Sequence, residues 1–327
     1  MQYFDDLIQL FNTKLEQEIM LIGNREPQNL YEPVVYTLNM GGKRIRPVLL
    51  LMAHNLYSPS FEEAFPAAFA IELFHNFTLL HDDIMDNADL RRNFQTVHKK
   101  FSPETAILSG DAMSILSYEY ITKCKSKNYR EIFELFTNTA LKICEGQQFD
   151  MDFENRNDVT VLDYLKMISL KTAILLAASL KLGALTGNSP IKDAELLYEF
   201  GFNLGMAFQL QDDLLDTFGK THEFGKNIGG DIVANKKTYL MLKSLELAKG
   251  EISLELNSLL SSTTINREEK IEKVKNIYSQ LDVVSLSQQK MDEYYNMALS
   301  NLAELNINNE KKSNLLFVAK KMMNRKS

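Results

Sequence analysis

Apolar residues recur every three or four positions through most of the 327-residue chain. That spacing puts the apolar side chains on one face of an α-helix. No stretch keeps the period-two alternation, joined by hairpin turns, that is typical of β-strands. We therefore expect an all-α protein of about ten or more helices. Two of the apolar stripes are formed by Leu73, Phe77, Leu80 and Ile84 and by Leu197, Leu204, Phe208 and Leu215.

Proline and glycine mark where helices begin and end. All seven prolines lie at or before Pro190, and no glycine follows Gly250. Ser102 followed by Pro103 is typical of an N-cap and the first helical position. Residues 251–275 are more polar, which predicts a connection between C-terminal helices. Because the sequence shows neither a repeat nor a long linker, residues 1–327 are predicted to form one domain, a single large helical bundle.

Composition narrows the possible partners. The net charge of −7 gives no field suited to nucleic acid, while the 45% of hydrophobic residues suffices for a large core. Cys124 and Cys144 form no closely spaced pair, which predicts reduced thiols in a cytoplasmic protein. The first residues lack a secretory pattern, and charges interrupt the longest apolar runs. We expect no membrane span.

The motif DDxxD occurs at residues 82–86 and again at residues 212–216. On a helix, residues i and i+4 share a face with Cβ atoms about 5–6 Å apart, so each motif directs two carboxylates to one point. These charges repel unless a cation lies between them, and Mg²⁺ prefers such oxygen ligands. One isolated motif is more often a solvated acidic face. Both motifs here interrupt strongly apolar helices, so we interpret them as a site for two or three metal ions.

Cationic residues accompany both acidic motifs. Lysine and arginine beside metal-binding carboxylates are suited to a multiply charged anion such as diphosphate. A single basic pair would be a solvated face, and it is the alternation of acidic and basic clusters that indicates a site. The cations are Lys43, Arg44 and Arg46 after a glycine pair, Arg91 and Arg92 after the first acidic motif, and Lys226 and Lys236 after the second.

From about Gly41 to Lys236 the chain resembles the trans-isoprenyl diphosphate synthases, also called the polyprenyl synthetase family. The segments that carry the resemblance, in the family's order and spacing, are GGKRIRP, HDDIMDNADLRR, EGQQFDM, SLKTA, FQLQDDLLD and GKNIGGDI. The resemblance implies a helical bundle of the isoprenoid synthase type with a central apolar cavity. Asn93 stands where glycine is commoner, but this difference removes no ligand.

The resemblance also implies roles for individual residues. Mg²⁺ is the expected cofactor, three ions with diphosphate bound, held by Asp82, Asp86 and Asp212, with Asp216 contributing through water. The positions that match the isopentenyl diphosphate site are Lys43, Arg46, His75 and Arg92. Those that match the allylic diphosphate site are Arg91, Lys171, Gln209, Lys226 and Lys236. Thr172 and Gln147 are expected beside the reacting carbons.

The implied reaction is ionisation, condensation and elimination. The allylic C–O bond breaks to give a cation, the double bond of isopentenyl diphosphate attacks it, and a proton then leaves. The protein positions the substrates, stabilises charge and keeps water out. The residues expected to be catalytic are Asp82, Asp86, Arg91, Lys171, Asp212 and Lys226.

Two other functions use part of the same residues. A terpene cyclase-like lyase performs the ionisation without the condensation, but it has no use for GGKRIRP. A non-catalytic subunit of a heteromeric prenyl synthase is expected to have lost acidic motifs, and this chain keeps both. The resemblance further implies a homodimer, which agrees with helices that are apolar on more than one face.

Product length should follow from the depth of the pocket below the first acidic motif. At 1.5 Å per residue, Phe77 lies about 7.5 Å and Phe74 about 12 Å from Asp82 along the helix. An isoprene unit spans about 5 Å, so a floor there stops growth after about three or four units, at C15 or C20. Thr78 is small where some short-chain members carry an aromatic residue, which favours C20. The alternative is that both phenylalanines are ordinary core residues.

The basic residues at the C-terminus allow two interpretations. They form either a solvated tail, which we favour, or a segment that closes over bound diphosphate. These residues are Lys320, Lys321, Arg325 and Lys326.

Overall fold

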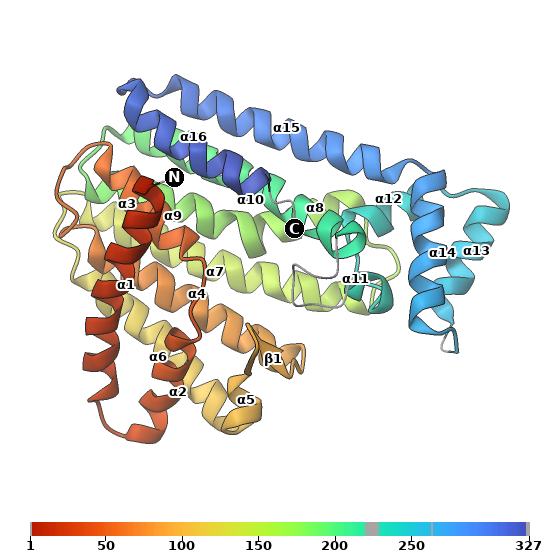
Figure 1. Ribbon diagram of the computed structural model, residues 1–327, viewed down its shortest axis with the longest axis horizontal. Coiled ribbons are helices and arrows are strands. Elements are labelled where there is room, and N and C mark those ends of the chain that lie inside the picture. The colour runs from red at the N-terminus through yellow and green to blue at the C-terminus, as the bar shows by residue number, and fades with distance from the viewer. Residues whose placement is uncertain (1, 220–228, 263, 325–327) are drawn as a thin grey trace. The chain divides into compact units, whose positions relative to one another are not determined.

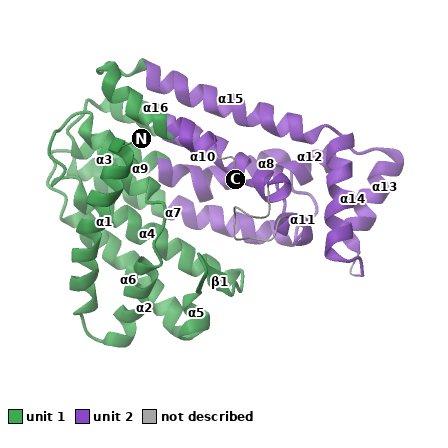
Figure 2. Cartoon of the chain, viewed as in Figure 1, with its two compact units in different colours: residues 1–140, 177–198, 304–318 green, residues 141–176, 199–303, 319–327 purple. Residues whose placement is uncertain are grey.

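The structure is a computed structural model that describes residues 2–219, 229–262 and 264–324 (Figure 1). Within these ranges it consists of α-helices, one π-helical turn and one short hairpin, which confirms the all-α prediction. The residues group into two compact units (Figure 2). Unit 1 contains residues 1–140, 177–198 and 304–318, and unit 2 contains residues 141–176, 199–303 and 319–327. A single domain over residues 1–327 stays a prediction.

Unit 1 is built around α4, which packs against α3 and α6. Small residues on α4, such as Ala67 and Ala70, are fully buried and allow these neighbours to come close. Leu73 and Leu80 of the predicted stripe are buried as expected. Ser102 accepts a hydrogen bond from the Thr105 amide, so it caps α6 as predicted. The elements here are α1 (Gln2–Gly23), α2 (Gln28–Asn39), α3 (Ile45–Asn55), α4 (Phe65–Met85), β1 (Leu90–Arg91), β2 (Phe94–Gln95), α5 (Val97–Lys100) and α6 (Pro103–Thr122).

Four helices have three or more residues in each unit. They are α7 (Tyr129–Glu154), α9 (Ile174–Thr186), α10 (Ile191–Phe218) and α16 (Asn309–Met323).

Unit 2 has two apolar clusters. One gathers Tyr164, Met206 and Leu210, and the other gathers Leu240, Val274 and further residues of the C-terminal helices. Its remaining elements are α8 (Val161–Ile168), the π-helical turn η1 (Ser169–Ala173), α11 (Gly230–Val233), α12 (Tyr239–Leu247), α13 (Gly250–Ser261), α14 (Arg267–Gln280) and α15 (Val283–Glu304).

One expectation from the sequence, a polar connection over residues 251–275, is wrong. Residues 251–275 are mostly helical, in α13 and α14, and Asn266 caps α14 by accepting from the Glu269 amide. A two-residue hairpin is present, with Leu90 opposite Gln95. Among the described residues, the helical run 161–186 is long and apolar enough to cross a membrane, although 72% of its apolar window is buried inside the protein, as in a core helix.

Candidate active site

The first acidic motif forms the C-terminal end of α4. The backbone amide of Asp86 donates to the Asp82 carbonyl at 2.8 Å, so these two residues lie one helical turn apart. Asp83 differs from both because it is buried, with 4% of its surface exposed, and accepts from Arg91 Nε at 2.7 Å. Burial raises the pKa of Asp83, although Arg91 opposes that shift. Asp82 and Asp86 are thus at least partly exposed to solvent, whereas the Asp83 side chain is buried inside unit 1.

Arg91 and Arg92 lie on the hairpin that follows α4. Arg91 Nη2 is 3.7 Å from Asp82 Oδ2, so its guanidinium pairs with two carboxylates of the motif. Arg92 occupies the tight turn with φ of 53° and donates through Nη1 to the Gly41 carbonyl. Gly42 has φ of 146°, a backbone conformation that favours glycine, and a Cβ there would lie 2.8 Å from the flexible end of Arg92, at Nη1.

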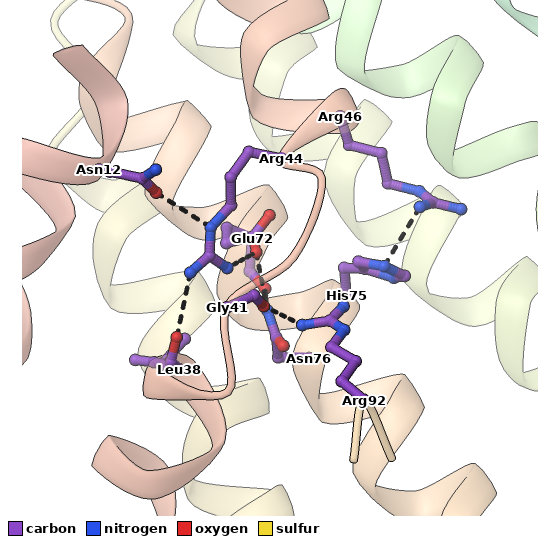
Figure 3. A network of polar contacts seen from close by, with 9 residues as sticks. All are labelled: Asn12, Leu38, Gly41, Arg44, Arg46, Glu72, His75, Asn76 and Arg92. Carbon is purple, nitrogen blue, oxygen red and sulfur yellow. Dashed lines mark hydrogen bonds and ion pairs between the residues drawn. The ribbon is translucent and has the colours of Figure 1, made fainter. Parts of the chain in front are cut away.

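Figure 3 shows the Arg44 and Arg46 side chains of the Gly41–Arg46 segment pointing in different directions. Lys43 is exposed and Arg46 is half-buried, whereas Arg44 is buried and bonded to Glu72. Arg46 Nη1 lies 3.2 Å from His75 Nε2. The positions predicted to bind isopentenyl diphosphate, Lys43, Arg46, His75 and Arg92, are therefore close together in unit 1.

His75 is a neutral hydrogen-bond acceptor. Burial and the Arg46 guanidinium lower the pKa of His75 well below 6.5. A guanidinium can only donate, so Nε2 accepts and the single ring proton of the neutral imidazole is on Nδ1. His75 therefore orients Arg46, and its own Nδ1–H is the group that can face an anion.

Phe74 and Phe77 differ in their surroundings. Phe74 is 2% exposed and packs against Phe136 of α7, with ring centroids 5.6 Å apart. Phe77 is half-buried and lies 5.3 Å from Phe74 and 4.7 Å from His81, measured between centroids. Thr78 is also half-buried, and its hydroxyl donates back to the His75 carbonyl at 2.8 Å. Phe77 and Thr78 are thus nearer to open space than Phe74.

The second acidic motif, near the end of α10 in unit 2, follows the same arrangement. Its middle residue Asp213 is buried, with 5% of its surface exposed, and accepts from the Tyr164 hydroxyl and from Gln209 Nε2, the latter at 3.0 Å. Burial and the charge of Asp231 raise the pKa of Asp213 to about 7. Asp212 and Asp216 are partly exposed, and Asp216 Oδ2 accepts from the Asp231 amide at 3.0 Å.

Lys171 and Thr172 lie on the π-helical turn η1. Lys171 Nζ is 2.6 Å from Asp150 of α7, and Thr172 donates to Gln209 Oε1 at 3.0 Å. The contacts from Thr172 to Gln209 to Asp213 connect the turn to the second acidic motif. Gln147 is half-buried on α7, three residues before Asp150. The structure therefore groups Lys171, Thr172 and Gln209 as predicted.

Two glycines make room for this turn. A Cβ at Gly146 of α7 would lie 2.5 Å from the Lys171 backbone nitrogen, and one at Gly205 of α10 would lie 2.6 Å from the Ala173 Cα. Glycine inside a helix costs about 0.5–1 kcal/mol relative to alanine. The close backbone packing against η1 accounts for that cost.

Lys236 is exposed and directly follows a turn at Asn235 with φ of 53°. Lys270 of α14 is buried and donates to Asn235 Oδ1 at 2.7 Å, so it holds that turn. Lys226, which the resemblance assigns to the allylic diphosphate, lies outside the described residues.

The end of α16 lies beside the second acidic motif within unit 2. Gln211, next to Asp212 in the chain, donates through Nε2 to the Met323 carbonyl at 2.5 Å. Lys320 and Lys321 are exposed on α16, and Arg325 and Lys326 lie outside the described residues.

The donor set suits Mg²⁺. Among the described residues, no three or more His, Cys, Asp or Glu side chains gather into a complete metal site. Each acidic motif offers two accessible carboxylates spaced by one turn. Mg²⁺ commonly takes one or two carboxylates and completes its octahedral coordination with water and substrate phosphate oxygens. The residues present therefore fit this ion together with a diphosphate ligand.

Sequence reasoning missed several residues that organise the site. Glu72, Tyr164 and Lys270 contact the motifs from outside them, and no sequence signal identifies them. Arg44, Asp83, Asp150 and Asp213 lie inside the motifs, but the motif letters do not show which side chains turn inward.

The polyprenyl synthetase family matches residues 27–281 of the chain. A geranylgeranyl diphosphate synthase from Sulfolobus acidocaldarius is 36% identical over 302 residues, which cover 91% of this chain and 89% of the relative. A farnesyl diphosphate synthase from Bacillus subtilis is 36% identical over 239 residues, 70% of this chain and 80% of the relative. The crystal structure of a geranylgeranyl pyrophosphate synthase matches with a TM-score of 0.93 and 44% identity over 99% of both chains. The chain therefore belongs to the polyprenyl synthetase family, the trans-isoprenyl diphosphate synthases.

Proposed function

We propose that this chain condenses isopentenyl diphosphate with an allylic diphosphate to make a short-chain all-trans prenyl diphosphate. The single observation that carries the proposal is that each of the two DDxxD motifs presents two accessible carboxylates beside substrate-type cations. Asp82 lies 3.7 Å from Arg91, and the neighbour of Asp212 in the chain, Asp213, is linked through Gln209 to the Lys171–Thr172 turn. Its relatives include enzymes named for C20 and C15 products, which agrees with the same reaction here.

We assign the two substrates to different groups of cations. Lys43, Arg46, His75 and Arg92 would bind the diphosphate of isopentenyl diphosphate. The allylic diphosphate would be bound by Arg91, Lys171, Gln209, Lys226 and Lys236. The contact between Arg46 and a neutral His75 supports the first assignment, because it orients the guanidinium without adding a competing acceptor charge.

Asp82, Asp86 and Asp212 would hold Mg²⁺, three ions with diphosphate bound, and Asp216 would contribute through water. When bound, these ions neutralise the allylic diphosphate and make it a better leaving group. Lys171 and Arg91 add positive charge where the C–O bond breaks. Thr172, held by Gln209, and Gln147 would orient the reacting carbons, and the departing diphosphate accepts the proton that is lost.

The rival functions are less well supported. A terpene cyclase-like lyase does not need the Lys43–Arg46–His75 group, and the contact between Arg46 and His75 supports its presence here. A non-catalytic subunit does not need both acidic motifs with accessible outer carboxylates. The two relatives from Sulfolobus acidocaldarius and Bacillus subtilis are named as synthases, which favours condensation as the reaction of this chain.

The proposed product is C20 rather than C15. Phe77 is half-buried and so is a better candidate for a pocket floor than the fully packed Phe74. The small Thr78 leaves space one turn before Asp82, which favours the longer product.

We further propose that the chain forms a homodimer. Helix α6 exposes Ile115 together with Leu108 and Ile107, which lie seven and eight residues before it and so near the same face. Apolar patches of this kind commonly mark protein interfaces. Light scattering should show a dimer for the native chain and a monomer for Ile115→Lys.

A cytoplasmic location is proposed from the unpaired thiols of Cys124 and Cys144 and is testable by fractionation.

The basic C-terminus either is a solvated tail or closes over bound diphosphate. The contact between Gln211 and Met323 places the start of the basic tail next to Asp212. This position supports closure of the tail over bound diphosphate. Val318, Ala319 and Met322 are buried, so the informative truncation ends the chain at Asn324 and leaves α16 intact. Unchanged kcat and KM values in that variant would leave the tail without a role.

One assay tests the proposed function. Purified protein is given labelled isopentenyl diphosphate with dimethylallyl, geranyl or farnesyl diphosphate in turn, with Mg²⁺ or with EDTA. Chromatography of the dephosphorylated products should show C20 prenols that require Mg²⁺. Cyclic hydrocarbons, or no condensation with any primer, would overturn the proposal.

A further inference from the structure

Arg44 is the one cation of the Gly41–Arg46 segment whose side chain points into the protein. Its side chain is 5% exposed, whereas Lys43 is exposed and Arg46 is half-buried. The proposed function uses Lys43 and Arg46 for substrate and leaves Arg44 without a task. A buried guanidinium needs compensating contacts, and these contacts indicate its role.

All three guanidinium nitrogens of Arg44 are bonded (Figure 3). Nη1 donates to Glu72 Oε1 on α4, Nη2 to the Leu38 carbonyl near the end of α2 at 3.0 Å, and Nε to Asn12 Oδ1 on α1 at 3.1 Å. Glu72, with 3% of its side chain exposed, also accepts from Asn76 Nδ2 at 3.0 Å. One planar side chain thereby fixes the loop to three helices.

Stability alone does not explain this ion pair. Removing two charges from water costs about as much as their attraction returns, and well-packed apolar side chains often stabilise a core equally well. A guanidinium with its rigid fork of donors does fix geometry, which apolar packing and a single lysine ammonium do not. The contribution of Arg44 is therefore to the conformation of the loop.

The loop has a backbone that requires such a restraint. Arg44 has φ of 49°, a left-handed conformation unfavourable for a residue with a Cβ, and Gly41 has φ of 76°. The Gly41 carbonyl is held by Arg92 from the hairpin. Arg44 then starts α3, since the Val48 amide donates to its carbonyl at 3.1 Å.

Glu72 and His75 lie three residues apart on α4 and so share a face. The loop consequently meets α4 at two points: Arg44 with Glu72 in the interior, and Arg46 with His75 toward the surface. The contact between Arg44 and Glu72 determines where the side chains of Lys43 and Arg46, which flank Arg44 in the chain, can reach.

We infer that Arg44, bound to Glu72, is a positioning residue that sets Lys43 and Arg46 at the spacing needed to bind the diphosphate of isopentenyl diphosphate. The inference rests on the proposed function. Its consequence is selective: losing the Arg44–Glu72 contact should weaken binding of isopentenyl diphosphate while leaving the allylic substrate bound as before.

The test compares Arg44→Lys, Glu72→Gln and Asn12→Ala with a matched control, Arg25→Lys. Arg25 also forms a two-bond ion pair in unit 1, with Glu119 of α6 at 2.9 and 2.8 Å, but this pair is 36% and 38% exposed and does not include a loop residue. For each full-length variant, kcat, both KM values, the melting temperature and hydrogen exchange of residues 39–46 are measured.

Arg44→Lys and Glu72→Gln should raise the KM for isopentenyl diphosphate about tenfold and change the allylic KM by less than about twofold. Hydrogen exchange in residues 39–46 should be faster in both of these variants. Arg25→Lys should change neither the KM for isopentenyl diphosphate nor this exchange. If both KM values rise together, or neither rises, the inference is overturned. Should the charged-pair variants fail to fold, Asn12→Ala, which loses one neutral bond, decides the question by faster or unchanged loop exchange.

Failure of the proposed function is recognised separately. Wild-type protein without condensation activity, or a Lys43→Ala variant with an unchanged KM for isopentenyl diphosphate, would contradict the substrate assignment. Loop exchange measured without substrate still tests Arg44: unchanged exchange in Arg44→Lys overturns the positioning role whatever the reaction.

Discussion

Arg46 donates from Nη1 to Nε2 of His75 at 3.2 Å, and this contact exists only while the imidazole is neutral. Burial and the neighbouring arginines hold the pKa of His75 well below the 6.5 of the unfolded chain. The unfolded chain therefore takes up a proton first as the pH falls, and the free energy of unfolding decreases below pH 6.5. The slope from this one group is at most about 1.4 kcal/mol per pH unit. Urea unfolding from pH 7.5 to 5 should show a shallower decrease for His75→Gln; equal curves would contradict the assignment.

Activity should require the outer carboxylates of both acidic motifs. Asp82→Ala or Asp212→Ala should lower kcat by at least about a thousandfold, because each removes a hard oxygen ligand for the metal that neutralises the leaving group. The matched control is Asp292→Ala, an exposed aspartate on α15. Initial rates are measured over a range of Mg²⁺ concentrations, with circular dichroism to check folding. Near-normal turnover in either variant at saturating Mg²⁺ would show that the metal ligands lie elsewhere.

The two cation groups should act on different substrates. Lys43→Ala should raise the KM for isopentenyl diphosphate about tenfold or more, and Lys171→Ala should do the same for the allylic diphosphate, since each removes one charge-assisted contact. Two-substrate initial-rate kinetics separates these effects. Asp150→Asn, which loosens Lys171 without removing its charge, should have a smaller effect on the allylic KM. The reverse pattern of KM changes would exchange the two sites.

Asp213 should contribute to both stability and alignment. Its pKa is raised from 3.8 to about 7, so the folded protein keeps this proton longer than the unfolded chain does. In metal-free protein the free energy of unfolding should therefore fall as the pH rises from about 4 through about 7. Asp213→Asn should remove that decrease. Tyr164 donates to Oδ2 and Gln209 to Oδ1, and asparagine has an oxygen at only one of these two positions. Asp213→Asn should therefore also lower kcat through a displaced Thr172.

Tyr164→Phe is the control for the effect of Asp213→Asn on kcat. Tyr164→Phe removes one donor to Asp213 and leaves Gln209 bonded, so it should lower kcat less than Asp213→Asn does. A larger loss in Tyr164→Phe would place the important contact at the tyrosine.

Product length should depend on Phe77 more than on Phe74. Phe77→Ala should lengthen the main product by at least one isoprene unit, because it opens space about 7.5 Å below Asp82. Phe74→Ala should chiefly lower the free energy of unfolding, by about 3–5 kcal/mol, as expected for an aromatic core residue. Chromatography of products and urea unfolding distinguish the two. An unchanged product distribution in the single and double variants would place the floor elsewhere.

The helices and the pairing of carboxylates could be predicted because both depend on local spacing. A period near 3.6 predicted α4 and α10, and the i, i+4 rule predicted that Asp82 and Asp86 lie on one face. The direction of the residues between them could not be predicted. Asp83 is rotated by about 100° from Asp82, and whether that side faces solvent or the interior depends on neighbouring elements far away in the sequence.

Charge was equally ambiguous in the basic segment. Lys43, Arg44 and Arg46 look alike in the sequence, and only the buried Glu72 distinguishes Arg44 from its neighbours. The error over residues 251–275 has a related cause. A few buried residues, such as Leu256 and Val274, suffice to hold α13 and α14 in place. The average polarity of residues 251–275 does not show them.

The π-helical turn also limits which substitutions the two helices beside it can accept. A Cβ at Gly146 of α7 would meet the Lys171 backbone nitrogen, and one at Gly205 of α10 would meet the Ala173 Cα. Any larger residue at either position must therefore push the backbone of η1 aside. The placement of Lys171 and Thr172 thus depends on two glycines that lie on other helices.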